Sequence, residues 1–395
     1  ESWGRFELNE TGIGRLDHKI AKLEIMNKVP GVEWLRPYAL SGDAGITLEE
    51  YAPFGVIGAI LPVTHSIPTL TGNVISMVAA GNSIVFNPHP GGAKSAALAA
   101  REDNKAIERE LGIDNLICTI EEPSLESFNQ ICQNEQIAIM AITGGPAVVQ
   151  AAMKSGKRSI CAGPGNPVVV IDDTADLARA ARNIIEGGGF DNNLLCIGEK
   201  AVFVVGSVYN QFLQEMEKAG AARLTAPQLD RLTASAFTFK EDDGGCSHAA
   251  VNRAFVGAGP DVLAREAGAT IPRGCELLFA ETDADHAYVQ EEQMMPMIPI
   301  VSVPDFETAV REAKRAEHGY GHSAILHSTN VAHMTHMGRE MDTTLFVKNG
   351  PSTAGLGLGG EGYLSYSIAT TTGEGITTPK TFTRIRRCVM VENLR

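Results

Sequence analysis

Short apolar runs alternate with helix-period segments between residues 54 and 154 of the chain. Residues 55–61 form an apolar run that ends at Pro62, and this pattern predicts a buried strand. Further strands are predicted at 84–86, 116–120 and 137–142, and helices at 71–80, 94–110, 125–134 and 147–154. Such alternation predicts an α/β fold with a parallel, doubly wound sheet, whose ligand sites lie at the carboxyl ends of the strands.

A second α/β region is predicted after residue 167. A strand at 168–171 enters it, and an amphipathic helix follows, with Thr174 as its N-cap and Gly187 as its stop. The apolar positions on one face of this helix are Leu177, Ala180, Ala181, Ile184 and Ile185. Another apolar run predicts a strand at 201–205.

Between that helix and that strand lies a single cysteine, Cys196, in a connection rich in glycine and asparagine. If Asn192 or Asn193 caps a short helical turn, Cys196 lies near the positive end of that turn. Such a position would lower the pKa of the thiol and favour the nucleophilic thiolate. A buried structural thiol is the alternative, since free cysteine packs like a small hydrophobic residue.

The remaining segments have weaker patterns. Residues 207–275 are expected to be helix-rich, with a glycine-marked break at 243–246. Strands are predicted at 277–280 and 296–303, and the spacing at 307–316 predicts a solvated amphipathic helix.

The two ends of the chain are predicted to form an arm that favours self-association. A helix is expected at 16–28, followed by an extended hairpin at 31–52 with a turn at Ser41-Gly42-Asp43. Residues 382–391 alternate between apolar and polar side chains as an edge strand does.

Two of the predicted strands end in loops suited to phosphate binding, at 87–92 and at 143–146. Pro146 suits the first position of the helix that follows the second loop. Glycines at a helix N-terminus let a phosphate approach the main-chain N–H groups. Either loop alone could equally be a tight turn, but two in one wound sheet favour a nucleotide site. The GxGxxG spacing at 355–360 has no helix after it and predicts only a loop.

Length and charge narrow the class of protein. At 395 residues the chain is too long for one core, so two or three domains are expected. The formal net charge of −14 argues against nonspecific nucleic-acid binding. Seven cysteines without a CxxC pair indicate a reducing cytoplasm, and no apolar run approaches the ~18 residues of a membrane helix. No signal peptide opens the chain, and because Glu1 is not a methionine a native N-terminal extension is expected.

Seven ordered motifs resemble the aldehyde dehydrogenase superfamily, above all its CoA-acylating branch with the propionaldehyde and acetaldehyde dehydrogenases of bacterial microcompartments. The motifs lie at 53–62, 84–90, 142–145, 162–166, 190–196, 291–296 and 346–351. The resemblance implies two doubly wound α/β domains plus an oligomerisation arm. It assigns a dinucleotide-binding domain to 1–30 and 53–163, with a return segment at about 367–380. It assigns a catalytic domain to 164–366 and the arm to 31–52 and 381–395.

The resemblance also carries residue roles to this sequence. By position, Cys196 resembles the superfamily nucleophile, and Glu292 resembles the glutamate that holds the nicotinamide ribose. His65 stands roughly where relatives place an asparagine of the oxyanion hole, with Thr64 beside it as another candidate donor. A satisfied loop histidine is the alternative at position 65.

The implied cofactor contacts lie in the strand-end loops. Asn87 stands where many relatives place a lysine that contacts the adenosine ribose, and Pro88 and His89 continue that loop. The other implied cofactor-binding residues are Thr143, Gly144, Gly145 and Gly163.

One departure from the family bears on the reaction. Hydrolytic relatives carry a glutamate just before a Gly-Gly motif, where it activates water, but this chain has Cys161 there. Without a general base, water attacks a thioester poorly. The implied reaction therefore oxidises a short aliphatic aldehyde, propanal first, with NAD and coenzyme A to acyl-CoA and NADH through a thioacyl intermediate on Cys196. A homodimer or homotetramer is implied, in the bacterial cytoplasm and inside a microcompartment, with its shell as a candidate partner.

Three alternatives stay open. A hydrolytic NAD(P)-dependent aldehyde dehydrogenase is disfavoured by Cys161. A zinc enzyme like histidinol dehydrogenase, which shares the Gly-Pro-Gly-Asn motif, is disfavoured because Gly319 and Gly321 interrupt any helix there and no HExxH motif is present. The histidines that suggest it are His318, His322, His327, His333 and His336. A noncatalytic scaffold is disfavoured by Cys196 and the two glycine loops, and no metal site is expected.

Overall fold

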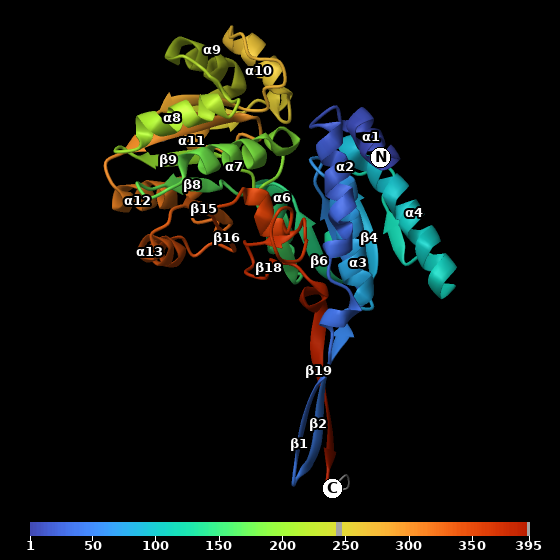
Figure 1. Cartoon of the computed structure of the whole chain (residues 1–395). Helices are drawn as coiled ribbons and strands as arrows, with labels where there is room; N and C mark the ends of the chain where they lie inside the picture. Colours follow the sequence, from blue (N-terminus) through green and yellow to red (C-terminus); the bar gives the residue numbers. More distant parts are fainter. Residues whose placement is uncertain (242–246, 393–395) are drawn as a thin grey trace. The chain divides into compact units, whose positions relative to one another are not determined.

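The computed structural model describes residues 1–241 and 247–392 and divides the chain into two compact units (Figure 1). Unit 1 comprises residues 1–11, 20–163 and 363–395, and unit 2 comprises 12–19 and 164–362. The division falls after Gly163, but residues 12–19 group with unit 2, whereas the motifs assigned 1–30 to the first domain. The break expected at 243–246 lies outside the described residues.

Unit 1 is built on a five-stranded parallel sheet with the strand order β5-β4-β3-β6-β7. Its strands are β3 (Val56–Leu61), β4 (Ser83–Pro88), β5 (Ile117–Thr119), β6 (Ile137–Thr143) and β7 (Ser159–Ala162). Its helices are α1 (Ser2–Thr11), α3 (Ser66–Ala79), α4 (Ala93–Leu111), α5 (Leu125–Gln133) and α6 (Pro146–Lys154). The strand order reverses between β3 and β6, which is where open α/β sheets place their ligand crevice.

The apolar strands of this sheet are buried on both faces. Ile57 and Ala59 of β3 pack into the core with α3 and α4, whereas Ile60 packs into a second core with α5 and α6. Because side chains alternate between the faces of a strand, a sheet covered on both sides needs continuous apolar runs. The doubly wound sheet predicted for this region is confirmed.

Unit 2 is built on a seven-stranded parallel sheet with the order β10-β13-β14-β9-β8-β15-β16. Its strands are β8 (Val168–Ile171), β9 (Ala201–Val205), β10 (Ala222–Arg223), β13 (Leu278–Thr282), β14 (Met297–Val303), β15 (Ser323–His327) and β16 (Leu345–Lys348). Helices α7 (Leu177–Gly189) and α8 (Tyr209–Lys218) cover one face, and α12 (Phe306–Glu317) and α13 (Val331–Met341) cover the other (Figure 1). The remaining helices are α9 (Ala226–Ala236), α10 (Pro260–Ala267) and α11 (Ala287–Gln290).

Helix α7, which leads to Cys196, begins and ends differently from the prediction. Its N-cap is Asp176, whose side chain accepts a hydrogen bond from the N–H of Arg179 at 3.0 Å. Thr174, the predicted cap, instead donates its hydroxyl to Asp172 at 2.7 Å. The helix continues two residues past Gly187, so the predicted stop is also wrong.

Some elements have bounds that differ from the prediction, and others were not predicted at all. Helix α3 begins at Ser66, five residues before the predicted start at 71, because Ser66, Ile67 and the residues after them are buried in the core. The region at 207–275 contains the predicted helices but also a hairpin of β11 (Phe237–Glu241) and β12 (Ser247–Val251). Strands β15 and β16 and helix α13 were not predicted.

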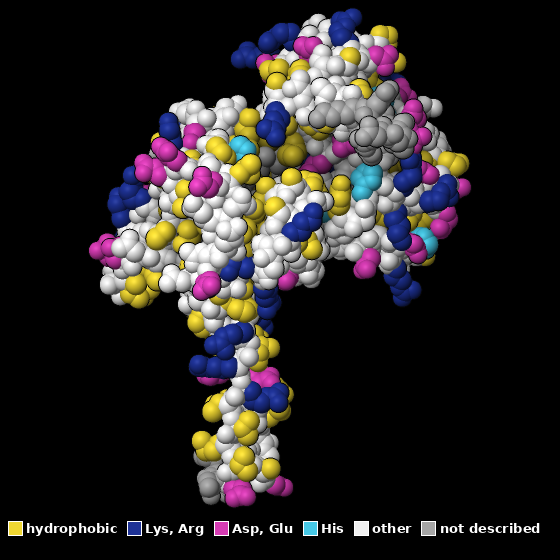
Figure 2. Space-filling model, turned by 180° about the vertical axis from the view of Figure 1, so that it is seen from behind, with side chains coloured by type: hydrophobic (Ala, Val, Ile, Leu, Met, Phe, Trp, Pro, Cys, Tyr) yellow, Lys and Arg dark blue, Asp and Glu magenta, His cyan; other side chains and the backbone are white. Residues whose placement is uncertain are grey.

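The predicted arm is a three-stranded antiparallel sheet of β1 (Tyr38–Gly42), β2 (Gly45–Pro53) and β19 (Thr383–Val391). Strand β19 is an edge strand, as the alternation at 382–391 predicted. Figure 2 shows hydrophobic and charged side chains mixed along this sheet. Its large exposed apolar side chains are Tyr38, Leu40, Leu48, Ile385, Val389, Met390 and Val391.

The segment after Thr11 contains α2 (Leu16–Glu24), and a 3-10 turn continues to Lys28, so the helix predicted at 16–28 is confirmed in its first part. A short pair of strands, β17 (Ile368–Ala369) and β18 (Gly375–Ile376), completes unit 1. Within the part of the chain that the structure describes, no helix is both long and apolar enough to cross a membrane.

Candidate active site

Four residues that stand just before neighbouring strands of the unit 2 sheet lie together. Gly165, Cys196, Glu292 and His322 come before β8, β9, β14 and β15, which are adjacent in the order β14-β9-β8-β15. Because these strands are parallel, their beginnings share one edge of the sheet. Cys196 therefore lies at the N-terminal ends of these strands. The expectation that ligand sites lie at the C-terminal ends of parallel strands does not predict the position of this cysteine.

Cys196 is the only residue between Gly187 and Val205 that is not buried. Its neighbours Leu195 and Ile197 are 4% and 1% exposed. Cys196 is therefore not fully buried, and its role as the nucleophile stays a prediction. A loop of buried residues that leaves one cysteine partly accessible suits a nucleophilic cysteine.

A strained turn precedes the cysteine. Asp191, Asn192 and Asn193 have φ values of 50°, 55° and 62°, a left-handed conformation that asparagine and aspartate tolerate better than other non-glycine residues. Asp191 accepts a hydrogen bond from the N–H of Arg15 at 2.7 Å, and Asn192 donates its amide to the carbonyl of Gly257 at 2.8 Å. These contacts hold a backbone conformation that is costly in isolation.

The predicted low pKa of Cys196 is wrong for this structure. No helix begins at Cys196, because Asn192 and Asn193 form the left-handed turn instead of capping a helical one. Burial raises the pKa of the Cys196 thiol to about 12, and the negative charge of Glu292 adds to the increase. The charge of Lys200 and the N–H groups of Cys196 and Ile197 act in the opposite direction.

Lys200 is a buried neighbour of Cys196 that the sequence analysis did not identify. Its side chain is fully buried, and its ammonium group donates to the carbonyl oxygens of Asn193 and Leu195, each at 3.1 Å. It also donates to the side-chain oxygen of Asn193. A lysine four residues after a cysteine gives no recognisable signal in the sequence, because its burial comes from tertiary packing.

Glu292 faces the same loop. Burial raises the pKa of its carboxyl group, whereas the charge of Lys200 and a hydrogen bond from the N–H of Gly165 lower it. Gly165 leaves no room for a side chain, since a Cβ atom there would lie 2.7 Å from Cγ of His322 and 3.0 Å from the carbonyl oxygen of Cys196. The predicted nucleophile and the predicted ribose-binding glutamate are thus brought close together.

His322 is a buried, neutral side chain of this site. Its Nδ1 atom shares a hydrogen bond of 2.8 Å with the hydroxyl of Ser323, and its Nε2 atom has no partner within the described residues. Burial lowers its pKa to about 4, and the charge of Lys200 adds to this effect. His318 is not on a shared helix face with it, because His318 ends α12 in a left-handed conformation and bonds to the carbonyl of Gln290.

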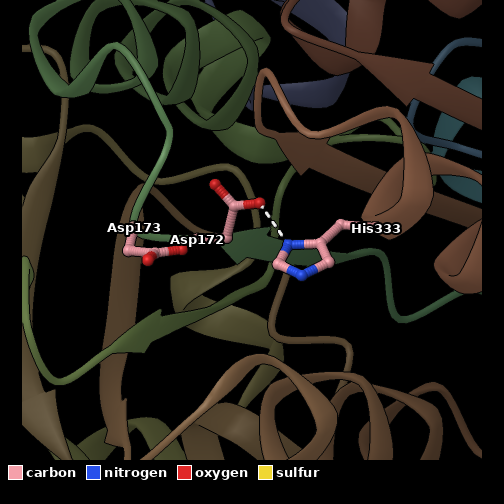
Figure 3. Close-up of side chains that lie close together, drawn as sticks. All are labelled: Asp172, Asp173 and His333. Atoms are coloured by element: carbon pink, nitrogen blue, oxygen red, sulfur yellow. Dashed lines mark hydrogen bonds and ion pairs between the residues drawn. The ribbon is translucent and has the colours of Figure 1, made fainter.

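A separate cluster of Asp172, Asp173 and His333 has atoms that could hold a metal ion (Figure 3). Asp172 contacts Nδ1 of His333 at 2.7 Å and accepts the hydroxyl of Ser328 at 2.5 Å, in addition to the hydroxyl and N–H of Thr174. The carboxylate of Asp172 is already occupied by these donors. The cluster therefore connects the end of β8 to Thr174, Ser328 and His333. Of the five histidines that suggested a zinc enzyme, only His333 belongs to this cluster.

In unit 1, Thr64 and His65 lie where β3 ends, beside the reversal of strand order. The hydroxyl of Thr64 lies 2.8 Å from Nδ1 of His65, and His65 is 4% exposed with its ring 5.8 Å from that of Tyr366. The geometry is that of a packed loop histidine with its Nδ1 engaged. An oxyanion role for either residue stays a prediction.

Two predicted cofactor contacts have buried side chains that bond to the protein. Asn87 accepts a hydrogen bond from the hydroxyl of Ser127 at 2.6 Å, and Thr143 shares one of 2.8 Å with Ser367. Pro88 is buried as the last residue of β4, and His89 is exposed, with Nδ1 accepting the N–H of Gly91 at 3.0 Å. Their contacts with a cofactor stay predictions.

The loop after β6 fits a phosphate group. Pro146 is the first residue of α6, as predicted, and no side chain caps this helix. Gly145 is exposed, and a Cβ atom there would meet nothing within 4 Å, so Gly144 and Gly145 leave the helix N-terminus open. An open, uncapped N-terminus is what a dinucleotide phosphate needs. Gly163 follows β7, where a Cβ atom would lie 2.5 Å from the hydroxyl of Thr371.

Cys161, which replaces the glutamate of hydrolytic relatives, is part of β7 and fully buried. Burial raises the pKa of its thiol to about 11, with a further contribution from the charge of Glu374. Its N–H donates to the hydroxyl of Thr372 at 2.9 Å. Position 161 therefore offers no base to activate water.

Comparisons with known proteins agree on one family. A sequence model of the aldehyde dehydrogenase family matches residues 35–362. The propanal dehydrogenase (CoA-propanoylating) of Salmonella typhimurium is 44% identical over 384 residues, which cover 97% of this chain and 81% of that protein. A structure of Rhodopseudomonas palustris propionaldehyde dehydrogenase with bound CoA and an acylated cysteine has a TM-score of 0.94 and 41% identity, covering 100% of this chain and 89% of that one. A propionaldehyde dehydrogenase from the fucose utilisation microcompartment of Clostridium phytofermentans has a TM-score of 0.95 with the same identity and coverage.

Proposed function

The chain belongs to the aldehyde dehydrogenase family, and on that premise we propose that it is a CoA-acylating aldehyde dehydrogenase. It converts a short aliphatic aldehyde, NAD and CoA into acyl-CoA and NADH, with propanal as the favoured aldehyde. The observation that carries this proposal is the half-buried Cys196 in a loop whose other residues are buried, together with the acylated cysteine and bound CoA of a relative that is 41% identical.

Cys196 forms the covalent bond to the substrate. Its thiolate adds to the aldehyde carbon and gives a thiohemiacetal, whose oxygen carries the negative charge. The N–H groups of Cys196 and Ile197 lower the pKa of the thiol, so they favour negative charge at this position, and we assign them as donors to that oxygen. Loss of one such donor typically costs about 3–4 kcal/mol of barrier.

NAD, when bound, supplies the acceptor for the hydride. We assign its phosphates to the open start of α6 at Gly144 and Gly145, and its nicotinamide ribose to Glu292. Loss of the hydride converts the thiohemiacetal into a thioester on Cys196.

The thiolate of CoA then attacks the thioester carbon, and the thiolate of Cys196 leaves. Water competes poorly in this step, because position 161 holds a buried thiol and no carboxylate. The covalent intermediate separates the two half-reactions, so ping-pong kinetics are expected.

The test is NADH formation from propanal with and without CoA, with propionyl-CoA and propionate measured separately by chromatography. CoA-dependent NADH formation with propionyl-CoA as the main product is expected. Equal rates without CoA, with propionate as the product, would establish the hydrolytic alternative.

We assign self-association as a homodimer or homotetramer to the arm, whose edge strand β19 presents Ile385 and Val389 with exposed fractions of 66% and 56%. Exposed apolar side chains on an edge strand favour pairing with another chain. Sedimentation velocity measures the mass directly. A wild-type monomer at micromolar concentration would contradict the assignment.

We also place the chain inside a microcompartment in the bacterial cytoplasm, on the strength of the Clostridium phytofermentans relative. Purified microcompartments from the source cells should contain it. Recovery only in the free soluble fraction would contradict this placement.

A further inference from the structure

We propose that Lys200 is a positioning residue of the active site, whose buried ammonium group holds the loop that presents Cys196 and stabilises the thiolate form of that cysteine. The proposal deepens the proposed function, because it rests on Cys196 as the nucleophile. It concerns a residue that the reaction scheme above does not use.

The hydrogen bonds of the Lys200 ammonium group go to the residues that lead into Cys196. An ammonium group has three N–H donors. Here they are directed at the carbonyl oxygens of Asn193 and Leu195, each at 3.1 Å, and at the side-chain oxygen of Asn193. The side chain thus links the end of the left-handed turn to the start of β9, and the half-buried Cys196 lies between these two points in the sequence.

These three acceptors are neutral, so they orient the ammonium group without cancelling its charge. Lysine is almost never fully buried without an ionised partner. Burial lowers the pKa of Lys200 to about 8, whereas the ionisable groups around it, Glu292, Cys196 and Glu199, favour its charged form. Since buried charges are poorly screened by salt or water, the charge of the lysine acts on the thiol of Cys196 and favours the thiolate.

None of the other ionisable groups described around Cys196 supplies a positive charge that would stabilise its thiolate. Burial and the negative charge of Glu292 both disfavour the Cys196 thiolate, and Lys200 is the side chain that counters them. Glu199 is held by Ser352 through two hydrogen bonds. His322 is kept neutral by burial, so it adds no positive charge.

The experiment measures alkylation of Cys196 by iodoacetamide in the full chain, without aldehyde, NAD or CoA, from pH 6 to pH 10. Peptide mass spectrometry reads Cys196 separately from the exposed Cys118 and Cys388. Lys200→Met, which keeps the length of the side chain and removes its charge, should react at least about tenfold more slowly at pH 8. A tenfold loss equals an increase of about one unit in the thiol pKa.

The matched control is Lys157→Met. Lys157 also donates to a main-chain carbonyl, that of Ile137 at 2.9 Å, but it belongs to unit 1 and contacts no residue of the cysteine loop. Its alkylation profile should match that of the wild type. A folded Lys200→Met variant with the wild-type profile would overturn the proposal.

Two further variants keep the test decisive if Lys200→Met does not fold. Lys200→Gln retains a donor without the charge and should also react more slowly. Glu292→Gln removes the negative charge that raises the pKa of the Cys196 thiol, whereas the positive charge of Lys200 remains. Cys196 should therefore be alkylated faster in this variant. Wild-type rates in Lys200→Gln, or a slower rate in Glu292→Gln, would overturn the proposal.

Alkylation needs no turnover, which separates this inference from the proposed function. If CoA-dependent activity is absent but Lys200→Met still loses alkylation, the proposed function fails and the role of Lys200 stands. If activity is present and alkylation is unchanged, only the role of Lys200 fails.

Discussion

The carboxylate of Glu199 accepts hydrogen bonds from both the N–H and the hydroxyl of Ser352, at 2.8 and 2.7 Å, although the two residues are 153 positions apart. Glu199 is fully buried between Cys196 and β9, and the backbone of Gly187 lies against its carboxylate without room for a side chain. Burial raises the pKa of Glu199 to about 7. This pair ties the cysteine loop to the segment that follows β16.

The raised pKa of Glu199 predicts a pH-dependent stability. The native state binds this proton more tightly than the unfolded state, so stability is expected to fall as pH rises from about 4.5 to above 7. Glu199→Gln should remove the contribution of Glu199 to this dependence, a difference of up to about 3 kcal/mol across that range. Urea unfolding at a series of pH values measures it, with Glu186→Gln on the exposed side of α7 as the control. Parallel profiles for Glu199→Gln and the wild type would contradict the prediction.

Replacement of the nucleophile should abolish the reaction without unfolding the protein. Cys196→Ala is expected to lose at least about a thousandfold of CoA-dependent NADH formation, since no other group can form the thioester. Its melting temperature should stay close to that of the wild type, because the thiol is partly exposed. Cys388→Ala, at an exposed position of β19, is the control. Substantial acyl-CoA formation by Cys196→Ala would refute the assignment.

A glutamate at position 161 should not create a good hydrolase. Cys161 is fully buried in β7, so Cys161→Glu places a carboxyl group in an apolar core and destabilises the fold by several kcal/mol. Hydrolysis should rise only slightly, because geometry as well as charge decides whether water is activated. The ratio of propionate to propionyl-CoA measures the outcome, and Cys161→Gln separates the effect of size from that of charge. A product that is mainly propionate would contradict this account.

The absence of a side chain at Gly165 should be essential for the shape of the site. Gly165→Ala brings a Cβ atom to within 2.7 Å of His322 and 3.0 Å of the Cys196 carbonyl, so the cysteine loop must move. A loss of about tenfold or more in kcat/KM is expected, equal to about 1.4 kcal/mol of barrier. Gly42→Ala in β1, where a Cβ atom meets nothing within 4 Å, is the control. Wild-type activity of Gly165→Ala would show that the loop tolerates the shift.

Metal chelation should leave activity unchanged. In the one group of possible metal ligands found in the described residues, Asp172, Asp173 and His333, the carboxylate of Asp172 already bonds to Ser328 and His333. Activity is therefore expected to survive dialysis against EDTA, and His333→Ala should retain it. A loss of activity that zinc restores would revive the zinc-enzyme alternative.

Local sequence patterns correctly predicted those elements whose conformation depends mainly on their own residues. The five apolar residues of β9 predicted a strand at 201–205, and the structure has the same bounds. Pro146 predicted the start of α6, because its ring fits the first turn of a helix and its missing N–H costs nothing there. The motifs around Cys196 and Glu292 were equally local, so they revealed the family before any coordinate.

The amino-acid sequence by itself thus determined the two wound sheets, the arm and the candidate nucleophile Cys196. The tertiary structure decided the electrostatic environment of that cysteine, including its raised pKa, the neutral His322 and the buried Lys200. It also decided the hairpin of β11 and β12 and the bond between Glu199 and Ser352. The reason is physical: burial and contacts across more than a hundred residues depend on how the whole chain packs, and no local spacing of residues encodes them.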